Sequence, residues 1–119
     1  MATRCNIRVI EDEHREMWFY RHCDGYPSSV LPSLEPLMIR LRNGQLRANL
    51  SQFAGWLVVV GHYEYRDDDD ESGMVFTDWK CGAYEPTTGQ HGDIDYLYTL
   101  DLRTKTLTYD NLTGCECCE

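Results

Sequence analysis

The chain has 119 residues, the length of one domain on the usual prior of roughly 100–200 residues. Hydrophobic residues make up 42% and aromatic residues 12%, which is enough to bury a core and excludes global disorder. Twenty acidic and 11 basic side chains give a formal net charge of -9. Phosphate backbones repel such a surface, so we expect no direct nucleic-acid binding.

No apolar run approaches the roughly 20 residues that span a bilayer, and the N-terminal MATRCNIRV lacks a signal-peptide pattern. We therefore expect a cytoplasmic protein, in which the six cysteines are free thiols. Three of them, Cys115, Cys117 and Cys118, crowd the end of the chain, and CECC lacks the second ligand pair of a zinc site. We predict one domain over residues 1–112, a cysteine-rich tail over 113–119, no metal and no cofactor.

Two strands open the predicted fold. Residues 3–10 alternate between apolar and polar side chains, which is the period of a half-buried strand. Residues 17–23 alternate in the same way, with Trp18, Tyr20 and His22 on one face. The charged residues 11–16 join the two strands into a hairpin with a loop longer than the two-residue ideal.

Two helices follow. Apolar side chains repeat at three and four residues from about residue 28, and Asn43-Gly44 is a helix stop. Ser28 or Ser29 could cap this helix, but Pro32 and Pro36 cannot both occupy its first turn. The helix therefore starts irregularly, or starts later with Ser33 as its cap. Residues 49–65 carry a second helical stripe, although WLVVV within them has strand propensity.

Three more strands are predicted over residues 74–84, 93–102 and 106–110, with a loop over 85–92 between the first two. Strands that adjoin in sequence usually pair, which predicts an antiparallel sheet of about five strands. Two helices on one face then give a two-layer α+β sandwich. Aromatic residues on the uncovered face would be exposed and would offer a surface for a homodimer: Trp18, Tyr20, Tyr96 and Tyr98.

The sequence has no phosphate-binding loop, no nucleophile elbow, no HExxH motif and no EF-hand loop. An arginine, a histidine, a cysteine and an aspartate stand in a row within YRHCDGY at residues 20–26. His22 and Asp24 share a face if the strand extends that far, as a general base and its orienting carboxylate would in an enzyme. The architectural interpretation is that Asp24 caps the turn, Arg21 pairs with an acid from the loops, and Tyr26 packs under the first helix.

A second ligand hypothesis concerns anionic small molecules. In this hypothesis Arg4, Arg21, His22 and Tyr26 would offer phosphate and base contacts to a nucleotide signal held between subunits of an oligomer. The acidic run at residues 66–72 favours a different class of partner. It has no apolar anchor, which predicts an exposed loop that could contact a basic protein through five carboxylates: Asp67, Asp68, Asp69, Asp70 and Glu71.

Three segments carry a family resemblance: TRCNIRV, then FYRHCDGYP, then DIDYLY. They resemble the TRxxI, YRHxDGYP and DI[DE]YxY motifs of a small uncharacterised family from bacteria, phages and prophages. The matching residues are Thr3, Arg4, Ile7, Tyr20, Arg21, His22, Asp24, Gly25, Tyr26, Pro27, Asp93, Ile94, Asp95, Tyr96 and Tyr98. The proline-rich helix start and the cysteine-rich tail depart from the family pattern.

The resemblance implies a phage or mobile-element gene. Small acidic proteins from such genes often look like inhibitors of host defence, for example of a CRISPR complex, and act by binding alone. The expected partner is then a basic, nucleic-acid-handling host protein, and the expected contact is the acidic run at residues 66–72.

Overall fold

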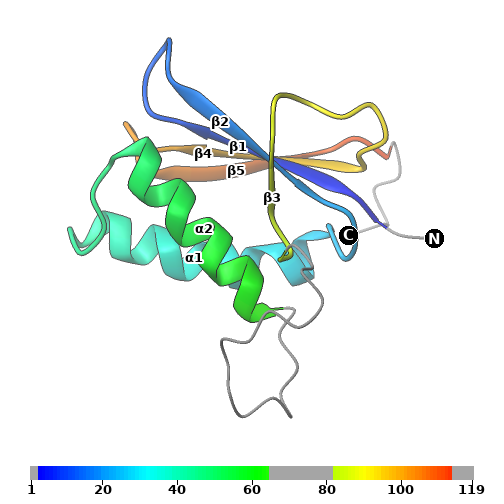
Figure 1. Cartoon of the computed structure of the whole chain (residues 1–119), viewed down its shortest axis with the longest axis horizontal. Helices are drawn as coiled ribbons and strands as arrows, with labels where there is room; N and C mark the ends of the chain where they lie inside the picture. Colours follow the sequence, from blue (N-terminus) through cyan, green and yellow to red (C-terminus); the bar gives the residue numbers. More distant parts are fainter. Residues whose placement is uncertain (1–2, 65–81, 114–119) are drawn as a thin grey trace.

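A computed structural model describes residues 3–64 and 82–113 of the chain (Figure 1). The order of its elements confirms the predicted order of two strands, two helices and three strands. The elements are β1 (Cys5–Ile10), β2 (Glu16–Arg21), α1 (Pro27–Arg42), α2 (Leu50–Glu64), β3 (Glu85–Thr87), β4 (Tyr96–Asp101) and β5 (Thr106–Asn111).

The five strands form one sheet in the order β3-β2-β1-β4-β5. Three of its pairings are antiparallel, but β1 and β4 run parallel, with Ile7 opposite Tyr98. The expectation of a wholly antiparallel sheet was therefore wrong, and the sheet is mixed. The rule that sequence neighbours pair holds for β1 with β2 and for β4 with β5. It fails between β3 and β4, which lie on opposite sides of the β2-β1 hairpin.

The connection from β3 to β4 crosses the face of the sheet that the helices leave open. His91, within this connection, donates its backbone N–H to Asn6 Oδ1 on β1 at 2.7 Å. Its ring stacks on Tyr20 of β2, with the ring centroids 4.1 Å apart. Because the chain crosses both strands before it enters β4, β4 can join the far side of β1 in a parallel direction.

Both helices cover the same face of the sheet, as the sequence predicts (Figure 1). The core between the two layers includes Phe19, Leu34, Phe53, Leu57 and Leu100, all fully buried or nearly so. None of the helices within residues 3–64 and 82–113 is long and apolar enough to cross a membrane.

Helix α1 begins at Pro27, ahead of both predicted starts, and neither Ser28, Ser29 nor Ser33 caps it. Pro32 and Pro36 lie inside the helix. Each proline removes one bond to the carbonyl four residues earlier, at residues 28 and 32, and all these residues are exposed. Water can satisfy those carbonyls, so α1 continues to Arg42, where Asn43 and Gly44 end it as predicted.

Two expectations about aromatic residues and late strands need correction. Tyr96 and Tyr98 are buried at 1% and 0% exposure because they face the helices, and Tyr20 is covered by His91 on the other face. They do not offer an exposed homodimer surface.

Within the expected loop at 85–92, residues 85–87 form β3, and the short edge position tolerates Pro86. The strand expected over 74–84 lies mostly outside the described residues, and 82–84 are not strand.

Candidate functional site

The structure divides the five candidate site residues, which are the four possible nucleotide contacts and Asp24, among different environments around the end of β2. Arg4 and His22 meet on the open face of the sheet, where Arg4 Nε donates to His22 Nδ1 at 3.3 Å. Arg21 is buried on the helix side, with 1% exposure. Asp24 and Tyr26 contact each other at the corner, where the Tyr26 hydroxyl donates to Asp24 Oδ1 at 3.2 Å. The five residues therefore do not form one surface.

Four side chains on the open face form what we call the Arg4–His22 cluster: Arg4, Tyr20, His22 and Asp93. The Arg4 Nε lies 3.4 Å from Asp93 Oδ2, and both side chains are partly exposed. The Tyr20 hydroxyl donates to the same Asp93 oxygen at 3.3 Å and lies 3.3 Å from His22 Nδ1. The side chains of the cluster thus join the residue before β1, the end of β2 and the segment before β4.

The electrostatics of the cluster favour a neutral Tyr20 and an accepting His22. Burial is the main cause that raises the pKa of Tyr20, and the nearby Asp93 carboxylate raises it further. Because Arg4 Nε–H can only donate, His22 Nδ1 must accept, which places the proton of a neutral imidazole on Nε2. The Nδ1 lone pair of His22 therefore accepts the hydrogen bond from Arg4. The enzyme hypothesis pairs His22 with Asp24, whereas the structure places it against Arg4 and Tyr20.

Arg21 holds the inner side of the same strand end. Its Nε donates to the Cys23 carbonyl at 2.7 Å, and its Nη1 donates to the Tyr84 hydroxyl at 3.0 Å. The guanidinium carbon also lies 5.2 Å from the centroid of the Tyr84 ring. Tyr84 in turn hydrogen-bonds Ser33 on α1. These contacts connect β2, the segment before β3 and α1, which is an architectural role for Arg21.

Three segments of the sequence meet at Gly25: TRCNIRV, YRHCDGYP and DIDYLY. A Cβ on Gly25 would lie 2.9 Å from both the Arg4 carbonyl carbon and the Cys5 nitrogen, so only glycine fits without a shift. The Gly25 N–H donates to Thr3 O at 2.8 Å, and the Tyr98 hydroxyl donates to Gly25 O at 2.8 Å. Asp24, just before it, adopts φ 56 to make this turn.

Sequence reasoning missed three residues of this site. Asp93 belongs to the Arg4–His22 cluster, and Asn6 and His91 lie next to it. The alternation of side chains along the strand already placed Tyr20 and His22 on one face, so the sequence alone predicted that these two cluster residues lie together. Asp93 and His91 reach it only because the connection before β4 crosses the sheet. No local pattern signals that crossing.

The remaining candidates have a simpler outcome. The acidic run Asp67–Asp70 with Glu71, and the tail cysteines Cys115, Cys117 and Cys118, lie outside the described residues. Cys5 is buried and Cys23 is exposed. Across residues 3–64 and 82–113, no group of three His, Cys, Asp or Glu side chains is placed to hold a metal ion. Asp24 adopts φ 56 in the turn, and Tyr26, the residue before α1, packs against the core.

Comparison with known proteins adds no relative: no family model, no curated protein and no solved structure matches the chain.

Proposed function

We propose that this chain is a non-enzymatic binding protein that contacts a basic, nucleic-acid-handling host protein and so inhibits a host defence system. The observation that carries the proposal is the distribution of charge. Residues 3–64 and 82–113 hold nine basic and 12 acidic side chains, a net charge of -3. The other -6 of the total -9 belongs to residues 65–81 and 114–119, mostly to the run Asp67–Asp70 with Glu71. Concentrated acidic charge suits a cationic partner surface.

The geometry at the end of β2 supports a binding protein and not an enzyme that uses His22 and Asp24. The members of the Arg4–His22 cluster contact one another, and Arg21 is committed to the Cys23 carbonyl and Tyr84. Every buried side-chain nitrogen and oxygen in the described part of the chain has a hydrogen-bond partner. Such groups orient the corner that precedes α1, which is a structural use of His22 and Asp24.

The test is capture of a partner by the full chain from a lysate of a bacterial host, followed by affinity measurement with the purified partner. Asp68→Lys/Asp69→Lys should weaken the complex by more than tenfold, which is about 1.4 kcal/mol of binding free energy. The matched control is Glu13→Lys/Glu85→Lys, which makes the same change of charge at two exposed described positions.

The control separates a specific contact from general attraction. Equal weakening by both variants would show that net charge matters and the acidic run does not. An unchanged affinity in both variants would reject an acidic contact surface altogether. A captured protein with no basic surface and no role in handling nucleic acid would reject the proposed partner class.

A second candidate function is binding of a small anionic ligand such as a nucleotide. The observation in its favour is that Arg4 and His22 lie side by side and accessible beside the Tyr20 phenol. Arg21 cannot take part from its buried position, and Asp93 competes with an anion for Arg4. Absorbance of the purified protein tests this function: a 260 nm excess that is lost in Arg4→Ala supports it, and a spectrum without that excess rejects it.

A further inference from the structure

The two edges of the sheet differ in how they are protected. The β3 edge has three residues with Pro86 at the centre, so it is short and lacks one donor. The β5 edge has six residues and no proline, and among the described strands only β4 pairs with it. Natural sheets discourage unwanted pairing with short strands and prolines of the kind seen in β3. Strand β5 therefore lacks the two protections, short length and a central proline, that β3 has.

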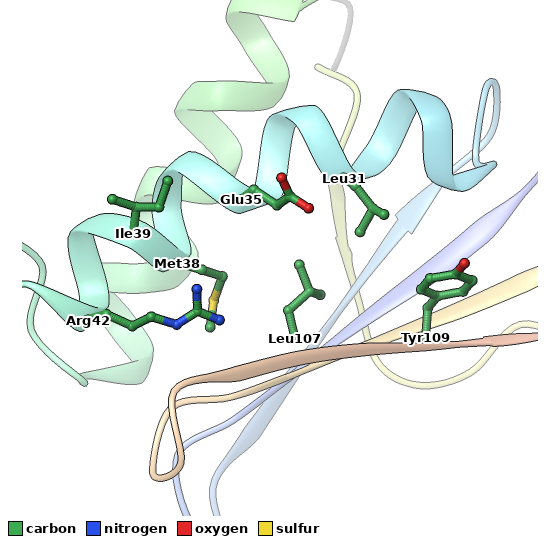
Figure 2. A pocket seen from close by; sticks show the side chains of 7 residues that line it. All are labelled: Leu31, Glu35, Met38, Ile39, Arg42, Leu107 and Tyr109. Carbon is green, nitrogen blue, oxygen red and sulfur yellow. The ribbon is translucent and has the colours of Figure 1, made fainter.

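The register of β5 shows which of its backbone groups point outward. Leu112 N–H donates to Asp95 O at 2.8 Å, and this bond continues the β4–β5 ladder. In an antiparallel ladder alternate residues turn their amides to the neighbour, so residues 106, 108 and 110 face β4. Leu107 and Tyr109 consequently direct their N–H and C=O groups away from β4, while their side chains point toward α1 (Figure 2).

Those two side chains line a groove of about 260 Å³ between β5 and α1 (Figure 2). From α1, Ile39 is 56% exposed at the groove, and Tyr109 of β5 is 46% exposed. Glu35 and Arg42 also line it, seven residues apart on α1. Seven residues are two helical turns, so the two charges lie on one side of the helix with Ile39 between them.

We propose that this face binds a second copy of the chain. Strand β5 of each copy pairs with β5 of the other in the antiparallel direction, which extends the sheet across both copies. A two-fold axis close to Ile39 then runs the two α1 helices antiparallel and sets Glu35 of each copy against Arg42 of the other. The surface is self-complementary because an apolar centre is flanked by one acid and one base.

The local charge allows two acidic molecules to meet here. The charged residues of α1 and β5, with Lys105 beside them, are Glu35, Arg40, Arg42, Lys105 and Asp110, a net charge of +1. The whole chain carries -9, so most approaches between two copies are repulsive. The face formed by α1 and β5 avoids that repulsion, which favours a second copy over a cationic partner at this site.

Sedimentation equilibrium of the full chain under reducing conditions tests the proposal, with a dimer expected at twice 13.9 kDa. Ile39→Lys places two like charges at the axis and should weaken the dimer by more than about tenfold. The matched control is Val59→Lys, which changes an apolar residue of α2 that is 41% exposed. Circular dichroism establishes that both variants keep the wild-type fold.

A charge exchange tests the two-fold arrangement itself. Glu35→Arg and Arg42→Glu should each weaken the dimer because each creates two like-charge pairs, and the double variant should restore it. A wild-type chain that stays monomeric at tens of micromolar overturns the proposal. A dimer insensitive to Ile39→Lys, or equally weakened by Val59→Lys, places the contact elsewhere. Failure of the double variant to restore the dimer rejects the antiparallel pairing of α1.

Discussion

The hydroxyl of Tyr98 donates a hydrogen bond to the carbonyl oxygen of Gly25 at 2.8 Å. Tyr98 is fully buried on β4, and Gly25 lies in the turn between β2 and α1. The bond thus ties the parallel strand pair to the corner from which α1 starts. It also joins the DIDYLY segment to the YRHCDGYP segment, which are 73 residues apart at this contact.

Tyr98→Phe should destabilise the fold by about 1–3 kcal/mol, because it leaves the carbonyl of Gly25 without this donor in a buried position. The free energy of unfolding from urea titration measures the effect. Tyr109→Phe is the matched control, since Tyr109 is half-exposed on β5, and it should change stability by less than about 0.5 kcal/mol. Equal stability of Tyr98→Phe and wild type would show that the bond contributes nothing.

The ionisation of the Tyr98 hydroxyl predicts how the stability of the fold responds to alkaline pH. Burial is the main cause that raises the pKa of Tyr98 well above its ordinary value of 10.0. A raised pKa means that the folded state keeps the proton while the unfolded state loses it above about pH 10. The stability that the fold gains from keeping Tyr98 protonated is therefore complete below about pH 10 and is lost as the pH rises further. Urea midpoints at about pH 8 and about pH 11 should therefore differ more for wild type than for Tyr98→Phe.

Gly25→Ala should destabilise the fold by about 1–3 kcal/mol, because its Cβ would collide with backbone atoms of Arg4 and Cys5 that cannot easily move. Gly89→Ala is the control: no atom lies within 4 Å of its added Cβ, so stability should stay level or rise slightly. Thermal unfolding of the two variants checks this contrast. A tolerated Gly25→Ala would mean that the corner can open without cost.

Arg21→Met should cost more than about 2 kcal/mol, because it removes the donors that hold the buried Cys23 carbonyl and the Tyr84 hydroxyl. Arg103→Met is the comparison. The Arg103 side chain is exposed and that of its partner Asp101 is partly exposed, and surface ion pairs contribute only about 0–1 kcal/mol. Urea titration of both variants at one pH gives the two values. An Arg21→Met variant as stable as Arg103→Met would contradict the role assigned to Arg21.

The candidate site shows where sequence reasoning stops. Strand alternation correctly separates Arg21 from Tyr20 and His22, because neighbouring side chains of a strand point to opposite faces. It cannot say which face the helices cover, so it could not tell that Arg21 is buried while His22 is exposed. Asp93 was visible only as part of a motif, and it contacts Tyr20, which lies 73 residues away along the chain, as well as Arg4.

By itself, the sequence determined the two helices, four of the strands and their order along the chain, because hydrophobic period is a local property. It also determined the end of α1 at Asn43-Gly44, where a glycine adopts φ +85. Tertiary structure alone decided the parallel pairing of β1 with β4, the burial of Tyr96 and Tyr98, and the position of β5 at one end of the order of described strands. Each of these depends on which distant segments pair, and the free energy that selects the pairing comes from packing of the whole core.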